Sequence, residues 1–325
     1  MEISLGLAPR PEAVAHAARA EQLGFERVWL FDSPALFADV WMTLALVAAR
    51  TRRVGIGPAV LGPHLRHPVA QASAIVTLEA MAPGRVAAAY GTGLTSRLAL
   101  GQRPLRWSEV ARRLTQVRAL LCGETVEVDG AATRLMHLPG YAPPRPVRVP
   151  LLLAADGPRG RGVASELADG IVCTRPRPGF RRCAVLAVGT VLGEGEPPDS
   201  ERALLPARIW SALRYHAAFE RDPPSVDDLP GGAAWRRDLE NRPAGERHLD
   251  LHVGHLAALN ERDARHVQPL RSRSVLTGTA AQLRARLSAL EEAGATELIW
   301  VPLGEAIERE LEMFAAATQL SVRAP

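Results

Sequence analysis

Short apolar runs alternate along the chain with longer stretches in which apolar residues recur at helical spacing. Apolar runs bounded by glycine, proline or charged residues are typical of strands buried in a parallel sheet. The pattern predicts eight strands, at Glu2–Ala8, Arg27–Ser33, Arg53–Leu61, Arg85–Gly93, Val149–Ala155, Asp169–Thr174, Ala184–Leu192 and Thr296–Pro302. Helical patterns separate most neighbouring runs, so the chain consists mainly of repeated strand–helix units.

Eight strand–helix units favour a closed (β/α)8 barrel, the TIM barrel, over an open sheet. The 325 residues suit a barrel of about 250 residues with insertions. A doubly wound sheet is the alternative, but that fold typically has a GxGxxG turn after the first strand. This chain has Ala8-Pro9-Arg10-Pro11 at that place. We therefore predict an α/β fold with one TIM-barrel domain over residues 1–325. A helical insertion is expected at about 204–267, between strands seven and eight.

Charge and composition exclude several classes of partner. All 39 basic residues are arginines, and the net charge is only +4. These arginines alternate with acidic residues and form no dense basic run, so we expect no nucleic-acid binding. We expect no membrane association, because no stretch reaches the roughly eighteen apolar residues of a membrane helix. The N-terminus lacks a signal-peptide pattern, and the three cysteines are irregularly spaced, which favours the cytoplasm.

In a barrel, binding residues gather at the C-terminal ends of the strands. The fourth strand ends in "YGTGLTSRLALG", whose hydroxyls, backbone N–H groups and Arg97 suit a phosphate or a polar ring edge. The fifth ends in "AADGPRG", where glycines and the start of a helix favour an anion. Either loop alone could be an ordinary turn, but two on adjacent strands predict a phosphorylated ligand.

The histidines of the sequence form no clear catalytic or metal-binding motif. Arg66 and His67 follow the third strand, where capping or packing of the next helix competes with ligand contact. His248, His252 and His255 are spaced four and three apart, so all three could share one helix face and ligate a metal. No carboxylate or cysteine completes that set, so we predict no metal and expect polar helix-face or lid histidines.

Five segments in chain order carry a family resemblance: "AEQLGFERVWLFDS", "RRVGIGPAVLGPHLRHPVAQASAIVTLEAMAPGR", "GTGLTSRLALGQRP", "VPLLLAADGPRGRGVASELADGIV" and "LTGTAAQLRARLSALEEAGATELIWVP". Together they resemble the bacterial luciferase-like flavin monooxygenase superfamily, in its methylene-tetrahydromethanopterin reductase-like branch. The resemblance extends from the first strand to the eighth. It implies a (β/α)8 barrel, usually dimeric, with reduced FMN or the deazaflavin coenzyme F-420 across the C-terminal mouth.

The resemblance also implies which residues hold the coenzyme. Its phosphate would lie at the fourth- and fifth-strand loops, against Thr92, Gly93, Thr95, Ser96, Arg97, Ala155, Asp156, Gly157 and Arg159. A non-prolyl cis peptide would fall at Ala59–Val60, beneath the flavin ring. Asp156 would repel a phosphate unless its side chain turns away or caps the following helix.

One departure from the family pattern concerns catalysis. Many members have Asp-His after the second strand, whereas this chain has Asp32-Ser33-Pro34. Serine is neither a cation nor a good base near neutral pH. The catalytic candidates are therefore His67, as a replacement histidine, and Ser33. The departure could also mark a branch that uses peroxyflavin chemistry, in which the flavin carries the difficult step.

The resulting expectation is an FMN-dependent monooxygenase that oxidises a small organic substrate with O2 while shielding the reaction from water. A separate flavin reductase would supply its reduced FMN. The alternative is F-420-dependent hydride transfer without O2, and a third possibility is a non-catalytic flavin-binding homologue. We expect a homodimer whose substrate is selected by the insertions Glu124–Val149 and Leu204–Val267.

Overall fold

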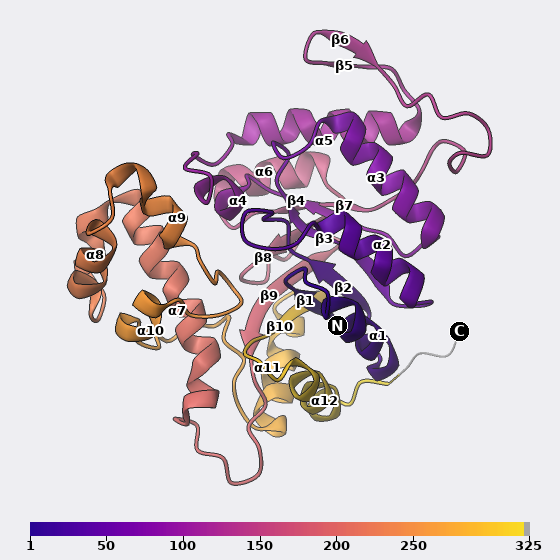
Figure 1. Cartoon of the computed structure of the whole chain (residues 1–325). Helices are drawn as coiled ribbons and strands as arrows, with labels where there is room; N and C mark the ends of the chain where they lie inside the picture. The colour runs from indigo at the N-terminus through magenta and orange to yellow at the C-terminus, as the bar shows by residue number, and fades with distance from the viewer. Residues whose placement is uncertain (322–325) are drawn as a thin grey trace.

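Eight parallel strands close into a barrel in the computed structural model, which describes residues 1–321 (Figure 1). Around the barrel the order is β1-β10-β9-β8-β7-β4-β3-β2, and all these pairings are parallel. The strands are β1 (Glu2–Leu7), β2 (Arg27–Leu30), β3 (Gly55–Leu61), β4 (Ala88–Tyr90), β7 (Leu151–Ala154), β8 (Gly170–Cys173), β9 (Cys183–Gly189) and β10 (Glu297–Pro302). The predicted TIM barrel is confirmed; residues 322–325 of the predicted domain lie outside the described residues.

Helices cover the outside of the barrel, as the alternating pattern predicts (Figure 1). They are α1 (Ala13–Leu23), α2 (Val40–Arg50), α3 (Pro68–Met81), α4 (Leu94–Leu98), α5 (Trp107–Cys122), α6 (Pro158–Leu167), α11 (Ala280–Glu292) and α12 (Ile307–Thr318). Local chemistry sets several of their ends. Gly24 adopts φ 90° and closes α1, while Thr279 and Gln282 form a capping box at the start of α11.

The barrel interior is filled with side chains. Trp29 is completely buried there and donates from Nε1 to Glu297 Oε1 at 2.7 Å. Small residues occupy much of the remaining space, including Ala87 and Ala89. At Gly57 the segment that leads into β4 comes so close that a Cβ atom would lie 1.9 Å from the Ala87 carbonyl oxygen. The interior is therefore a packed core that closes the base of the mouth.

A helical lobe is inserted between β9 and β10 and lies beside the barrel (Figure 1). Its elements are α7 (Glu201–Arg221), the 3-10 helix η1 (Pro223–Asp228), α8 (Gly232–Glu240), the 3-10 helix η2 (Ala244–Glu246), α9 (Arg247–Leu251) and α10 (Glu261–His266). The lobe has its own apolar cluster around Tyr215, Phe219 and Trp235. Its first helix begins three residues before the predicted boundary, because Ser200 accepts a hydrogen bond from the Ala203 N–H and caps it.

A small hairpin projects from the barrel within the expected insertion Glu124–Val149 (Figure 1). Strands β5 (Val126–Val128) and β6 (Ala131–Thr133) are joined by Asp129 and Gly130, both with positive φ. An Asp-Gly pair in this conformation is a favoured hairpin turn.

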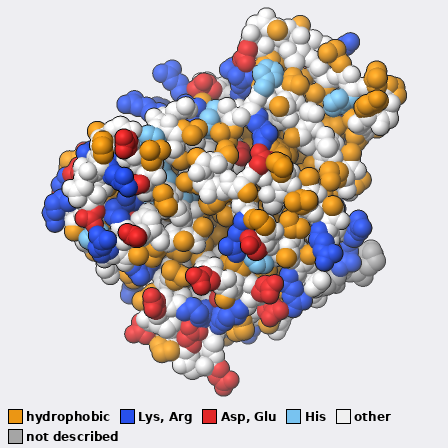
Figure 2. Space-filling view, viewed as in Figure 1, with side chains coloured by type: hydrophobic (Ala, Val, Ile, Leu, Met, Phe, Trp, Pro, Cys, Tyr) orange, Lys and Arg blue, Asp and Glu red, His pale blue; other side chains and the backbone are white. Residues whose placement is uncertain are grey.

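Acidic and basic side chains are mixed across the face shown in Figure 2, consistent with the small net charge. Within residues 1–321, no helix combines the length and apolar character that crossing a membrane requires.

Candidate active site at the mouth of the barrel

A cavity of about 430 Å³ lies at the C-terminal ends of the strands. Its volume is in the range of about 300–1,000 Å³ typical of small-molecule sites. The barrel interior supplies its apolar wall, through Ala59, Val60, Ala154, Val172, Leu186 and Ile299. Its polar groups come from strand-end loops and from one turn of the insertion. The cavity is therefore an apolar slot with a polar rim.

Most of the predicted coenzyme residues meet at this cavity. The residues that line it are Ala59, Val60, Thr92, Gly93, Thr95, Ser96, Ala155 and Asp156. Three others do not line it. The Arg97 side chain turns toward the Arg103 carbonyl oxygen, Gly157 is the N-cap residue of α6, and Arg159 is exposed. These three residues lie outside the lining of the cavity, and their contact with a coenzyme phosphate stays a prediction.

Asp156 does not cap α6, because Gly157 occupies the N-cap position without a side-chain hydrogen bond. Its carboxylate instead accepts hydrogen bonds from the Thr174 N–H and hydroxyl, both at 3.0 Å. Arg177 Nη2 lies 3.7 Å from the same carboxylate. Two ways to relieve repulsion between Asp156 and a phosphate are expected, capping of α6 or turning the side chain away. The Asp156 side chain turns toward the end of β8.

The end of β3 carries the irregularity that the family resemblance implies. The Ala59–Val60 peptide bond is cis, and the register with β4 shifts between Ala59 and Leu61. Both residues of that bond line the cavity. A Cβ atom at Gly91 would come within 2.7 Å of Val60 Cγ1. Glycine at position 91 therefore gives the bulge room on the β4 side.

Asp32 is the buried acid of the cavity and lies two residues after the end of β2. It is 8% exposed, and its Oδ2 atom accepts a hydrogen bond from the Gly62 N–H at 3.3 Å. Burial raises the pKa of the Asp32 carboxyl to about 6, although the Gly62 hydrogen bond and Arg66 act in the opposite direction. Ser33, one of the two catalytic candidates, lines the cavity beside it. A carboxyl with such a pKa can both accept and return a proton near neutral pH.

His67, the other catalytic candidate, lies on the surface rather than among the residues that line the cavity. Its Nδ1 atom accepts a hydrogen bond from the Val69 N–H at 3.3 Å, which makes it the N-cap of α3. Of the two roles considered for this residue, the structure shows capping. The structure therefore places His67 at a helix cap, outside the residues that line the cavity.

His64 is the histidine that sequence reasoning missed near this site. A Cβ atom added at Gly62 or Gly93 would lie 2.7 or 2.9 Å from its ring, so the ring sits between the ends of β3 and β4. Both ring nitrogens are buried and lack a hydrogen-bond partner among the described residues. Burial, with a smaller effect from Arg97, lowers the His64 pKa to about 4. The ring is therefore neutral at physiological pH.

The insertion contributes a wall of the cavity through His255 and Leu256. His255 Nε2 lies 3.0 Å from Thr95 Oγ1, which links the insertion to the loop after β4. The predicted helix face of three histidines is wrong, since α9 ends at Leu251 and only His248 lies within it. His248 packs near Gly101, while His252 and His255 follow the helix end. Trp107, Cys173 and Thr174 are further lining residues.

Comparison with known proteins identifies relatives of this chain. Residues 3–297 match the family model described as luciferase-like monooxygenase. An F420-dependent glucose-6-phosphate dehydrogenase of Beutenbergia cavernae is 32% identical over 247 residues, covering 63% of this chain and 70% of the relative. A 5,10-methylenetetrahydromethanopterin reductase of Archaeoglobus fulgidus is 28% identical over 164 residues, covering 49% and 48%.

The fold is also similar to a solved structure. An F420-dependent secondary alcohol dehydrogenase, in complex with an F420-acetone adduct, aligns over 99% of both chains with a TM-score of 0.68. Its sequence identity of 19% makes this a likeness of fold.

Proposed function

Because this chain belongs to the luciferase-like monooxygenase family, we propose that it transfers a hydride between a small organic substrate and the deazaflavin coenzyme F420. The chain is an enzyme of the luciferase-like oxidoreductase class, as expected, and this disfavours the third possibility, a non-catalytic flavin-binding homologue. The observation that carries the coenzyme proposal is the 32% identity to an F420-dependent dehydrogenase. This favours the hydride-transfer alternative over the FMN-dependent monooxygenase.

The cavity fits a flat, partly polar coenzyme. Its apolar walls suit the faces of a ring system, and Thr92, Thr95 and Ser96 bring hydroxyl-bearing side chains to its lining. The loops after β4 and β7 would hold the phosphate end. When bound, F420 supplies a carbon centre that accepts or donates a hydride. The chain itself supplies binding, orientation and exclusion of water.

Asp32 is the residue we propose to move the proton. An alcohol that is oxidised by hydride loss must also release its hydroxyl proton, and a buried carboxylate in the same cavity can accept it. In the reverse direction, reduction of the carbonyl compound, the protonated carboxyl donates that proton to the carbonyl oxygen. Ser33, next to Asp32, would orient the substrate oxygen by hydrogen bonding, since its hydroxyl is not a base near neutral pH.

The second candidate function is the FMN-dependent monooxygenase, favoured by the description of the matching family. It differs in needing O2 and a source of reduced FMN, for which a separate flavin reductase would be a partner. Under the leading proposal the reaction needs neither. The substrate class remains a small organic molecule with an oxidisable hydroxyl or a reducible carbonyl.

An anaerobic titration of the purified full chain with F420 and with FMN, each in both redox states, tests the proposal. We expect F420 to bind at least tenfold more tightly than FMN. Thr92→Val, which removes one cavity hydroxyl, should weaken F420 binding. Thr133→Val, in the hairpin β6, is the matched control and should leave it unchanged. Tighter binding of reduced FMN, with substrate-dependent O2 uptake, would establish the monooxygenase instead.

A further inference from the structure

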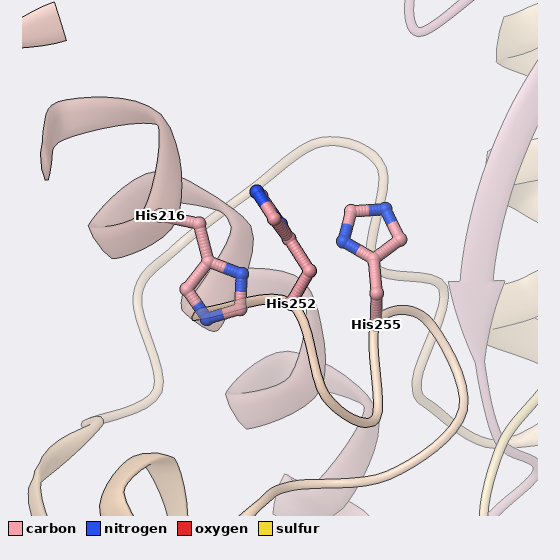
Figure 3. Close-up of side chains that lie close together, drawn as sticks. All are labelled: His216, His252 and His255. Carbon is pink, nitrogen blue, oxygen red and sulfur yellow. The ribbon is translucent and has the colours of Figure 1, made fainter. Parts of the chain in front are cut away.

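Three histidines of the insertion converge at the side of the cavity (Figure 3). His216 lies on α7, while His252 and His255 lie in the turn after α9. One nitrogen from each ring lies within 4.8 Å of the corresponding nitrogens of the other two. The ring of His252 stands between the other rings, with centroids 5.4 Å from His216 and 5.8 Å from His255 (Figure 3).

Each of these rings has a buried nitrogen with no hydrogen-bond partner among the described residues. The nitrogens concerned are His216 Nδ1, His255 Nδ1 and both nitrogens of His252. His252 Nε2 does lie 3.5 Å from Glu220 Oε1, an ion-pair distance rather than a hydrogen bond. A buried polar atom without a partner costs about 1–3 kcal/mol. Several at one place indicate that a group outside the polypeptide satisfies them.

The remaining nitrogens hold the outer two rings in position. His216 Nε2 lies 2.9 Å from Asp263 Oδ2, and the same carboxylate accepts hydrogen bonds from Trp235 Nε1 and Asn260 Nδ2. His255 Nε2 is held at 3.0 Å by the Thr95 hydroxyl. In Figure 3 the opposite nitrogen of each outer ring faces His252. A histidine oriented by a carboxylate on its far nitrogen is the usual arrangement of a metal ligand.

We propose that His216, His252 and His255 form a tri-histidine site for a divalent first-row transition metal, with Zn²⁺ the ion that fits best. Neutral imidazole nitrogens are favoured ligands of Zn²⁺, bound at about 2.0–2.1 Å. Tetrahedral geometry at that distance places ligand nitrogens about 3.4 Å apart, so the rings close by little more than 1 Å on binding.

The metal would connect the insertion to the mouth of the barrel. His216 anchors it in the core of the lobe, where Asp263 and Trp235 are buried. His255 lines the cavity and contacts Thr95 on the opposite side. Three protein ligands leave a fourth position for water or another ligand. The site therefore goes beyond the proposed hydride transfer, which has no step that needs a metal.

The test is metal binding by the tag-free full chain after treatment with a chelator. We expect it to take up one Co²⁺ or Zn²⁺ per chain, with visible d–d absorption of Co²⁺ that Zn²⁺ abolishes. His252→Gln should lower the affinity by at least about 100-fold. Asp263→Asn should lower it by about 10–100-fold, because it removes the carboxylate that orients His216.

His248→Gln is the matched control, since His248 lies four residues before His252 but outside the cluster. It should bind metal like the unmodified chain. Far-UV circular dichroism of the metal-free variants checks folding, and His255→Gln replaces His252→Gln if the latter does not fold. Equal metal uptake by the unmodified chain and the folded cluster variant would overturn the site. Coenzyme binding, measured on the metal-free protein, reports separately on the proposed function.

Discussion

At position 32 the folded chain holds a proton more tightly than the unfolded chain does. The usual pKa of 3.8 is raised to about 6 by burial at the end of β2. As pH rises, the unfolded chain therefore loses this proton first. The contribution of Asp32 to the free energy of unfolding falls as pH rises through the window from about 4 to about 6, and it stays low above that window.

Replacing Asp32 with Asn should therefore stabilise the protein above this window. The amide oxygen still accepts the Gly62 hydrogen bond, while the cost of burying a charge is removed. We expect the free energy of unfolding to rise by up to about 3 kcal/mol at pH 8 and by less at pH 5. Urea denaturation at both pH values measures it. Asp199→Asn, at an exposed position, is the control, and an equal gain at both pH values would contradict the assignment.

The same carboxyl should set the pH dependence of the reaction. In the direction of alcohol oxidation the ionised form is needed, so the rate should rise with pH through about 6. Asp32→Asn should lower the rate by about 10²–10⁴-fold, the usual contribution of a general base. Ser33→Ala should cost far less and keep the pH profile. Coenzyme reduction followed by absorbance gives both profiles, and an unchanged profile in Asp32→Asn would exclude this role.

Residues near strand ends are the part of the site that sequence can predict. Thr92 and Thr95 lie just after a predicted strand, and a barrel places every such end at one mouth. His255 could not be found in this way, because its partner Thr95 is 160 residues away in the chain. His64 and His67 both follow β3, and only their side-chain environments distinguish a buried ring from a helix cap.

Among the elements, β3 and α6 each contain two glycines, and Gly57 and Gly162 differ in the space around them. Gly57 in β3 has the Ala87 carbonyl oxygen 1.9 Å from the position of a Cβ atom, whereas nothing lies within 4 Å of that position at Gly162 in α6. Gly57→Ala should lower the free energy of unfolding by at least about 1–3 kcal/mol through overpacking. Gly162→Ala should raise it by about 0.5–1 kcal/mol, because alanine is the better helix former. Equal effects in urea denaturation would refute the packing argument.

Element type follows from the sequence where the pattern is long and buried. All eight barrel strands lie within their predicted segments except for Cys183, which begins β9 one residue early. Hairpin strands β5 and β6 have only three residues each, too few to show alternation. The histidine spacing after position 247 predicts a helix face, but α9 ends at Leu251 and the chain turns. Spacing alone does not reveal where a helix stops.

At the scale of the whole molecule, exposed apolar side chains gather where copies of the chain can meet. On α2, Met42 is 73% and Leu46 59% exposed, and beyond the hairpin Met136 and Tyr141 are 77% and 80% exposed. Figures 1 and 2 show α2, α3 and the hairpin on one side of the molecule, with hydrophobic side chains gathered there. Large exposed apolar patches mark interaction sites, and we propose that this side forms a homodimer.

Light scattering coupled to size-exclusion chromatography should therefore give twice the mass of 35.0 kDa. The double variant Met42→Glu with Leu46→Glu should be monomeric, because it buries two charges in the interface. Leu249→Glu is the control on the insertion, where the side chain is 59% exposed, and it should leave the dimer intact. If the unmodified chain is monomeric, the homodimer is excluded. If the double variant is still dimeric, the interface lies elsewhere.

The contact between Thr95 and His255 also limits how the barrel and its inserted lobe can be exchanged. One end belongs to the loop proposed to hold the coenzyme, and the other belongs to the segment expected to select the substrate. The lobe therefore cannot be exchanged independently of the barrel. A chimera that takes its lobe from another barrel therefore needs a residue at position 95 that is compatible with that lobe. Without it, we expect the chimera to change its substrate preference and to bind the coenzyme more weakly.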